Sequence, residues 1–379
     1  MLDRKIRFAI IGCGLMGREF ASAAARWCHI TADIPRPVIV GVCDHTAAAR
    51  AWFENNFDTV KYSVGDYHEL LDKDDIDAVY CAVPHNLHAE FYTNIIRAGK
   101  HLLGEKPFGI DKSANDEIMR AIDENPGVVV RCSSEFPYYP AAQELIRWIK
   151  QERFGKLIEV RAAFCHSSDM DTSKTINWKR RVEINGEYGC MGDLGLHTQH
   201  IPFRMGWKPI NVYATLSKII TERPDGNGGM APCLTWDNAV LNCEVVDNDG
   251  GIFPMITETK RLAPGATNEW RLEVYGLKAS ARFSTNDPGA FNFTEAWGRE
   301  QAWCRVDMGY KPMIPTITGS IFEFGFTDAI LQMWAAFICE VCAIPVEFGC
   351  IRPEETALSH RVFTAALESH KQKRAIPID

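Results

Sequence analysis

Residues 6–17 read IRFAIIGCGLMG, a short apolar run that leads directly into three closely spaced glycines. Gly12, Gly14 and Gly17 have the spacing G-x-G-x-x-G, and the alanine-rich residues 18–28 that follow predict a helix. In such a strand–turn–helix the first glycine makes the tight turn and the second lets a ligand approach the backbone. The third lets helix and strand pack closely. The stretch therefore predicts a dinucleotide-binding fold, with phosphate held at the helix N-terminus.

The remainder of the first 135 residues repeats this alternation of strand and helix. Apolar, strand-like runs occur at 38–44, 77–84, 101–107 and 127–135, and helical patterns at 46–57, 88–100 and 113–125. Strands buried on both faces have continuous apolar sequences, and regular strand–helix alternation produces a parallel sheet covered by helices. We expect an α/β fold that begins with a doubly wound parallel sheet of the Rossmann type.

The pattern changes after residue 136. One helical pattern at 140–155 precedes segments with alternating polar and apolar residues, at 156–166, 211–221, 238–246, 252–261, 269–276 and 280–285. Turn-rich pieces separate several of them, which indicates a large, mostly antiparallel, open-faced sheet. Helical patterns at 324–343 and 353–371 complete the chain. We expect a Rossmann domain over residues 1–135 and a second α/β domain over 136–379, whose C-terminal helix packs back toward the first.

Composition and charge exclude several classes of function. A chain of 379 residues suits two domains, since single cores rarely grow past roughly 250–300 residues. Its formal charge of −8 argues against nucleic-acid binding. Neither a signal peptide nor an apolar run of about 20 residues is present, so we expect a cytoplasmic protein without a membrane partner. The thirteen scattered cysteines suggest reduced thiols rather than a disulfide framework.

Asp44 ends the second predicted strand, where a carboxylate can accept both ribose hydroxyls of NAD. It lies thirty residues after Gly14, and the insert HITADIPRP at 29–37 accounts for this long spacing. Because a carboxylate repels a 2′-phosphate, we predict NAD rather than NADP. The neighbouring His45 weakens this preference, since an imidazolium tolerates phosphate. Alternatively, Asp44 only caps the following helix.

Lys106 directly follows an apolar strand and precedes a proline, which restricts its backbone to an extended form. Ligands of open α/β sheets gather beyond the carboxyl ends of the strands. We therefore expect Lys106 to point into the ligand crevice. The alternative is a surface ion pair within the Glu105-Lys106 dipeptide.

Residues 189–200 read GCMGDLGLHTQH and place Asp193 and His197 one helical turn apart. Three interpretations compete: an acid/base pair, a metal site, or an amphipathic helix that faces water. A metal site needs a fourth ligand besides Asp193, His197 and His200, and His166 is the conceivable candidate. We predict no metal, because three ligands on one helix rarely converge.

Four motifs in this order resemble the Gfo/Idh/MocA family of NAD(P)-dependent oxidoreductases: GCGLMG, PHNLH at 84–88, EKP at 105–107 and GDLGLH at 192–197. The stretch VYGLKASARFST at 274–285 is similar to a strand–Gly–strand element of the family's second domain. The resemblance implies a Rossmann domain followed by an α/β domain whose large sheet often forms the oligomer interface. It also implies that Lys106, Asp193 and His197 are catalytic.

The resemblance extends to cofactor and substrate contacts. INWKRR at 176–181 resembles the family's Trp-Arg element, with Lys179 at the arginine position, and the insert at 220–240 resembles one in members acting on sugars, anhydrosugars and inositols. We predict these cofactor-binding residues: Gly12, Gly14, Leu15, Met16, Gly17, Asp44, Pro84, His85, Asn86, His88, Glu105, Lys106 and Glu135. We predict these substrate-binding residues: Lys106, Glu135, Trp178, Lys179, Asp193 and His197.

Two departures from the family pattern concern the substrate. Members often have Pro-Asn where this chain has Pro84-His85-Asn86, and an Asn-Tyr-Arg-like stretch where it has SSEFPYYPA at 133–141. Glu135 therefore lies near the expected nicotinamide, and the arginine that would bind an acidic substrate is missing. The change favours a polyol as substrate.

We predict an NAD-dependent dehydrogenase of a ring hydroxyl in a sugar, a glycoside (for example at C3) or an inositol. His197 would take the hydroxyl proton, Asp193 would orient His197, and Lys106 would bind the reacting oxygen and hold His197 neutral. An alternative is a redox-neutral enzyme that cleaves a glycoside by transient oxidation and elimination. A non-catalytic NAD or sugar sensor is a third hypothesis. We expect a homo-oligomer, a dimer or tetramer, assembled through the C-terminal sheet.

Overall fold

The computed structural model describes residues 4–296, 298 and 300–379, and the chain divides into two compact units. The first unit comprises Met1–Gly109, Ser113–Tyr138 and Tyr310–Pro353, and the second comprises Ile110–Lys112, Tyr139–Gly309 and Glu354–Asp379. Both units are therefore discontinuous along the chain. The division into domains over residues 1–135 and 136–379 remains a prediction.

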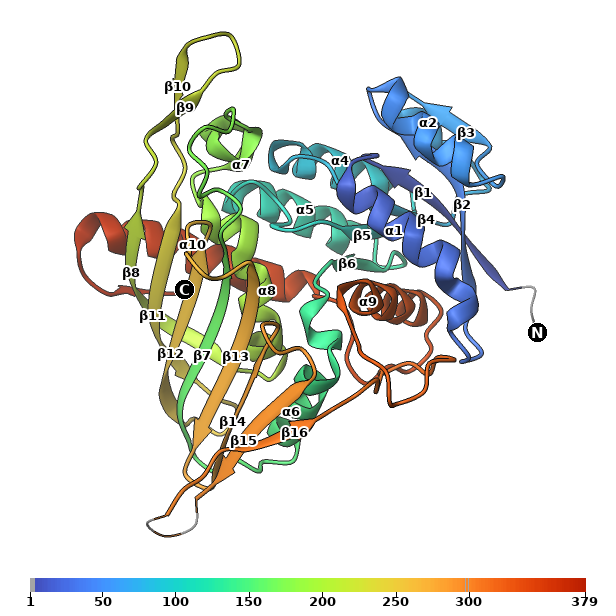
Figure 1. Cartoon of the computed structure of the whole chain (residues 1–379). Coiled ribbons are helices and arrows are strands. Elements are labelled where there is room, and N and C mark those ends of the chain that lie inside the picture. Colours follow the sequence, from blue (N-terminus) through green and yellow to red (C-terminus); the bar gives the residue numbers. More distant parts are fainter. Residues whose placement is uncertain (1–3, 297, 299) are drawn as a thin grey trace. The chain divides into compact units, whose positions relative to one another are not determined.

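The first unit contains a six-stranded sheet in the order β3-β2-β1-β4-β5-β6, with every neighbouring pair parallel (Figure 1). This confirms the predicted doubly wound sheet. Its strands are β1 (Lys5–Ile11), β2 (Arg36–Cys43), β3 (Tyr62–Val64), β4 (Ala78–Cys81), β5 (His101–Gly104) and β6 (Val130–Cys132). The sequence pattern missed β3, because its three residues are all half-buried and too short to form an apolar run.

Helices connect the strands of this sheet, and all but the short α3 lie close to the predicted ranges. They are α1 (Leu15–Ala25), α2 (Ala47–Asn56), α3 (His68–Leu71), α4 (His88–Arg97) and α5 (Lys112–Glu124), with 3-10 turns η1 (Arg26–His29), η2 (His85–Leu87) and η3 (Phe136–Tyr138). The later helix α9 (Phe326–Val341) also belongs to the first unit. Trp334 of α9 packs its ring against Phe8 of β1 and Tyr80 of β4, with centroids 5.3 Å and 5.4 Å away. A segment near the end of the chain thereby completes the core of the Rossmann sheet.

The second unit is built on a nine-stranded sheet in the order β16-β15-β14-β13-β7-β12-β11-β8-β17 (Figure 1). All neighbouring pairs are antiparallel except β7 and β12, so the sheet is mostly antiparallel, as predicted. The strands are β7 (Leu157–His166), β8 (Lys208–Ser217), β11 (Asn238–Val246), β12 (Ile252–Lys260), β13 (Asn268–Gly276), β14 (Ala279–Ser284), β15 (Ala290–Glu295), β16 (Cys304–Asp307) and β17 (Ile376–Pro377).

Helices and a small hairpin complete the second unit. The helices are α6 (Pro140–Lys150), α7 (Val182–Asn185), α8 (Cys190–Arg204) and α10 (Pro353–Gln372), with the 3-10 turn η4 (Trp178–Arg180). The hairpin joins β9 (Glu222–Pro224) to β10 (Met230–Pro232) within the insert that the sequence singled out. The sequence patterns missed this hairpin, the short helices α3 and α7, and the strands β15, β16 and β17.

Alternating burial along β11 and β12 shows how the large sheet positions helix α8. Ala239, Leu241, Cys243 and Val245 of β11 are almost fully buried, whereas the residues between them are more exposed. On the buried face Thr259 of β12 donates a hydrogen bond to the Cys190 Sγ at the start of α8. The sheet therefore carries α8 on its inner face and leaves its outer face open, as the period of two predicts.

Candidate active site

The glycine loop has the geometry that dinucleotide binding requires. Gly12 has φ +96°, and a Cβ at this position would lie 2.3 Å from the Ala82 carbonyl oxygen. A Cβ at Gly17 would lie 2.3 Å from the Gly12 carbonyl oxygen, so both positions need glycine for packing. A Cβ at Gly14, by contrast, would meet no atom within 4 Å. The loop backbone is therefore tightly held on two sides and open at Gly14, where a pyrophosphate would approach.

Asp44 follows β2 and is bound to the same loop. Its Oδ2 accepts a hydrogen bond from the Cys13 N–H at 3.0 Å, and its Oδ1 accepts one from the Thr46 N–H at 2.8 Å. The exposed His45 ring lies 3.4 Å from Oδ1. Asp44 therefore caps the segment after β2 and also fixes a carboxylate beside Gly12 and Gly14. The capping and ribose-binding interpretations are compatible.

Glu105 connects the carboxyl ends of three strands in the first unit. Its Oε1 accepts hydrogen bonds from the Tyr80 hydroxyl of β4 and the Ser133 hydroxyl that follows β6, both at 2.7 Å. The side chain is 7% exposed. These contacts support a structural role for Glu105, which holds the end of β5 from which the half-buried Lys106 follows.

His85 and His88, both predicted to bind the cofactor, are buried. The His88 Nδ1 accepts a hydrogen bond from the Gly109 N–H at 3.3 Å, and Nε2 lies 3.1 Å from the Val83 carbonyl oxygen. Because Nδ1 accepts here, this geometry places a proton on Nε2, which faces the Val83 carbonyl oxygen. Among the other predicted cofactor residues, Gly14, Leu15 and Asn86 are exposed. Met16 and Pro84 are partly buried.

Glu135 lies between β6 and η3 and is only 7% exposed. Burial raises the pKa of its carboxyl to about 7; nearby Glu105 raises it further, and Lys106 lowers it in part. The charges of Glu105 and Lys106, which follow β5, thus change the pKa of Glu135, which follows β6. A carboxyl that titrates near neutral pH can both hold and release a proton.

Helix α8 carries Asp193 and His197, which the sequence predicted as an acid/base pair. It begins after Gly189, which has φ +57°, and a Cβ there would lie 2.5 Å from the Trp236 backbone nitrogen. Close packing against Trp236 therefore explains this glycine. Asp193 is 0% exposed and His197 is 4% exposed. The interpretation of α8 as a solvated amphipathic helix is wrong, because nearly all of its residues are buried.

The carboxylate of Asp193 lies between two cations. Lys179 Nζ is 3.0 Å from Oδ2 and 3.2 Å from Oδ1, and Arg261 Nη2 is 3.2 Å from Oδ2. The Lys179 side chain is 37% exposed, and its ammonium lies 5.8 Å from the Trp178 ring centre. Lys179, predicted as a substrate residue, is therefore paired with Asp193 in this unit.

His197 and His166 share an aromatic environment. The Phe164 ring is 5.3 Å from the His197 ring in an edge-to-face arrangement and 6.1 Å from the His166 ring. The His197 carbonyl oxygen accepts a 2.9 Å hydrogen bond from the Trp270 indole N–H, which fixes this turn of α8. Burial lowers the pKa of His166 to about 4; Lys179 and Arg261 lower it further, and Asp193 opposes them. His166 is therefore neutral at physiological pH.

The metal interpretation finds no support in the described part of the chain. No group of three or more His, Cys, Asp or Glu side chains among those residues is arranged to hold a metal ion. His200 is 1% exposed within α8.

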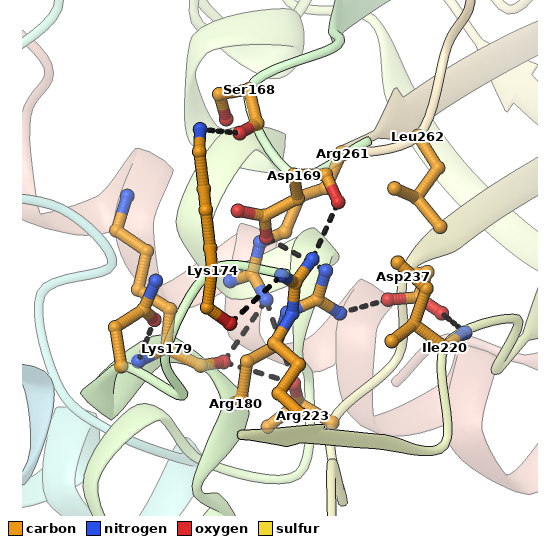
Figure 2. A network of polar contacts seen from close by, with 12 residues as sticks. Ser168, Asp169, Lys174, Lys179, Arg180, Ile220, Arg223, Asp237, Arg261 and Leu262 are labelled. Carbon is orange, nitrogen blue, oxygen red and sulfur yellow. Dashed lines mark hydrogen bonds and ion pairs between the residues drawn. The ribbon is translucent and has the colours of Figure 1, made fainter. Parts of the chain in front are cut away.

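A buried ionic network that the sequence analysis missed surrounds these residues. Figure 2 shows Arg180 between Asp169 and Asp237, and Arg223 directed at the carbonyl oxygens of Asp169 and Lys174. The buried Arg261 completes the network beside Lys179. One pattern could have identified Arg261. The inward positions of β12 are 253, 255, 257 and 259, and residue 261 continues that alternation.

The comparisons with known proteins agree with this architecture. Residues 6–132 match the oxidoreductase family with an NAD-binding Rossmann fold, GFO_IDH_MocA. The Rossmann part of this chain is therefore of the Gfo/Idh/MocA family. The levoglucosan dehydrogenase of Pseudarthrobacter phenanthrenivorans is 26% identical to this chain over 297 residues, 74% of each chain. A scyllo-inositol 2-dehydrogenase (NADP(+)) of Bacillus subtilis is 28% identical over 237 residues, 62% of this chain and 69% of the relative.

Solved structures extend the similarity of fold to nearly the whole chain. A levoglucosan dehydrogenase in complex with NADH and L-sorbose superposes with a TM-score of 0.86 at 20% identity, covering 99% of both chains. The protein is an NAD-binding oxidoreductase, and the relatives named above act on levoglucosan and scyllo-inositol. The open loop at Gly14 and the carboxylate of Asp44 fit that cofactor. Among the described residues, no helix has the length and hydropathy to cross a membrane.

Proposed function

We propose that the enzyme oxidises one ring hydroxyl of a sugar, glycoside, anhydrosugar or inositol to a ketone. The hydroxyl proton passes to His197, the carbon gives up its hydrogen as hydride, and bound NAD accepts that hydride. The observation that carries the proposal is the buried Asp193 carboxylate, held by Lys179 and Arg261 one helical turn before His197. A fixed negative charge there orients the imidazole and stabilises it after it has taken the proton.

Lys106 completes the proposed catalytic set by donating a hydrogen bond to the reacting oxygen. Its place directly after β5, at the carboxyl edge of the parallel sheet, supports this role. The proposal requires Lys106 and His197 to act on the same substrate. A double-mutant cycle tests this requirement, because groups that act as a unit lose much less together than the product of their separate losses.

The substrate is proposed to be a neutral polyol. The aromatic Phe136 follows Glu135 where an arginine would bind an acidic substrate, and Trp178 with Lys179 supplies an apolar wall and a hydrogen-bond donor. The test is a panel of levoglucosan, free sugars, glycosides and inositols incubated with NAD, in which NADH is measured by its absorbance. Reduction with an acidic sugar and with no neutral member of the panel would contradict the proposal.

Glu135 favours a second candidate, redox-neutral glycoside cleavage. In that reaction transient oxidation at C3 makes the C2 proton acidic, a base removes it, and the aglycone leaves by elimination. Hydride then returns from NADH. A carboxyl whose pKa is raised to about 7 suits this additional base. Release of the aglycone without accumulation of NADH would support cleavage, and stoichiometric NADH would support the dehydrogenase.

We also expect a homo-oligomer formed through the outer face of the large sheet. Ile158, Tyr213 and Ile252 on these strands are 50%, 43% and 60% exposed, which supports an apolar contact surface. Light scattering coupled to gel filtration measures the mass. A monomeric mass at micromolar concentration would contradict this expectation.

A further inference from the structure

Arg261 follows β12 directly and is 0% exposed. Its guanidinium donates to four kinds of acceptor in the second unit, one of them the Thr235 hydroxyl at 3.5 Å. Nε and Nη2 lie 3.3 Å and 3.2 Å from the Asp193 Oδ2. Nη1 donates to the Lys179 carbonyl oxygen at 3.0 Å. Nη2 also donates to the Asn185 Oδ1 at 3.2 Å and to the Gly189 carbonyl oxygen at 3.4 Å.

These acceptors come from separate segments that a single side chain joins. The Lys179 carbonyl belongs to η4, Asn185 ends α7, and Gly189 precedes α8. A buried guanidinium is stable only when its N–H groups are hydrogen-bonded, so the cation and its acceptors determine one another's positions. A lysine in this place would keep the charge but could not reproduce the planar, forked set of donors.

Asp193, Arg261 and Lys179 differ in exposure, and this difference indicates different roles. Asp193 and Arg261 are almost completely buried, and the Lys179 side chain is 37% exposed. Lys179 is therefore the member of this cluster that a substrate can reach. Arg261 lies behind it and holds both its backbone and its carboxylate partner.

We propose that Arg261 is a positioning residue for the oxidation, which sets Lys179 and the first turns of α8 in the arrangement that the reaction needs. This rests on the proposed function, since it assumes that Asp193 and His197 serve the proton transfer. Arg261 itself meets neither substrate nor cofactor. Its loss should displace catalytic groups without changing their identity, and a displacement of about 1 Å can reduce turnover by about 10²-fold.

The test compares Arg261→Gln and Arg261→Lys with a matched control, Arg223→Lys. Arg223 is another buried arginine of the second unit, 1% exposed, whose contacts are the carbonyl oxygens of Asp169, Asp171 and Lys174. All variants are studied as full-length protein saturated with NAD. Binding of NAD to the glycine loop, followed by fluorescence, gives the concentration of folded enzyme for each.

Two measurements by NMR do not depend on turnover. The Trp270 indole N–H donates to the His197 carbonyl oxygen, so its resonance reports the position of α8. The pKa of His166 reports the charges around it, which are Asp193, Lys179, Arg261 and Asp169. Removing the Arg261 cation should raise the pKa of His166 from about 4, because the remaining carboxylates favour the imidazolium.

The expected result for Arg261→Gln is a shifted Trp270 resonance, a raised pKa of His166 and a kcat lowered by about 10²-fold. Arg261→Lys should recover the pKa of His166 and only part of kcat, and Arg223→Lys should leave both at their original values. Unchanged Trp270 and kcat in Arg261→Gln would overturn the proposal, as would equal losses in Arg223→Lys. If no polyol reduces NAD even with the unmutated enzyme, the proposed function fails, and the NMR shifts alone decide whether Arg261 positions α8.

Discussion

Glu135 in the first unit and Asp193 in the second are both buried carboxyl groups, yet their surroundings differ. Glu135 has burial and a second carboxyl, Glu105, raising its pKa to about 7 against the partial effect of Lys106. Asp193 has two cations within 3.2 Å, Lys179 and Arg261, which favour its ionised form. Burial alone therefore does not set the charge of a carboxyl group. The number and distance of its ionic neighbours decide it.

The largest effect is expected for a substitution of His197, which tests whether the catalytic base lies beside Asp193 or is Glu135. If His197 beside Asp193 takes the proton, His197→Ala should reduce kcat by roughly 10²–10⁴-fold, the usual range for a general base. Affinity for NAD should hardly change, because we expect the glycine loop and Asp44 to hold the dinucleotide. Steady-state kinetics and calorimetric titration with NAD measure the two quantities. Near-normal turnover across the pH range would transfer the role to Glu135.

Removing the charge of Asp193 tests the ionic surroundings directly. Asp193→Asn leaves the buried Arg261 without its carboxylate, and breaking a buried pair in this way typically costs about 3–5 kcal/mol. Denaturant unfolding of the purified variant measures this loss, with Asp287→Asn as the control. Asp287 pairs with Arg305 at 3.1 Å, and both side chains are at least half exposed, so little change is expected there. Similar stability of the two variants would contradict our account of Asp193.

The raised pKa of Glu135 should make the folded protein less stable as pH rises, whereas the ion pairs of Asp193 stabilise it. Between pH 4.5, its ordinary value, and about 7, the folded protein keeps a proton that the unfolded chain has lost. The free energy of unfolding should therefore fall as pH rises through this window, by at most about 3 kcal/mol. Glu135→Gln should remove this part of the pH dependence. The free energy of unfolding of the variant should therefore exceed that of the original protein by a larger amount at pH 8 than at pH 5. Parallel stability curves for the two proteins would disprove the raised pKa.

Asp44 is a third carboxyl group, held mainly by backbone N–H donors rather than by cations. Asp44→Ala should weaken NAD by roughly tenfold and reduce the preference over NADP, since about 1.4 kcal/mol of ribose hydrogen bonding is lost. Calorimetry with both dinucleotides measures the ratio. Equal affinities in the unmutated protein would refute the assignment.

Removal of metal ions is expected to have no effect on activity. If Lys179 and Arg261 balance the charge of Asp193, prolonged treatment with EDTA should leave activity unchanged. Elemental analysis of the purified protein should find no stoichiometric metal. Activity that disappears with EDTA and returns with one divalent ion would mean that a metal acts at Asp193 after all.

Local sequence predicted much of this protein because the relevant interactions are local. The glycine spacing requires a tight turn and close helix packing at Gly12 and Gly17, whatever surrounds them. Continuous apolar runs predicted parallel strands, and the period of two predicted the inward face of β12. The separation of four residues between Asp193 and His197 likewise predicted that they lie one turn apart on a single helix, which is α8.

Tertiary structure decided the electrostatics. The partners of Asp193 are 14 and 68 residues away in sequence, and no local pattern indicates which carboxylate the inward-facing Arg261 meets. The same holds for His88, whose two ring nitrogens face backbone groups of separate segments, and for α9, which enters the core of the first unit. Propensity and spacing act over a few residues, whereas desolvation and ion pairing depend on which distant groups the fold brings within about 4 Å.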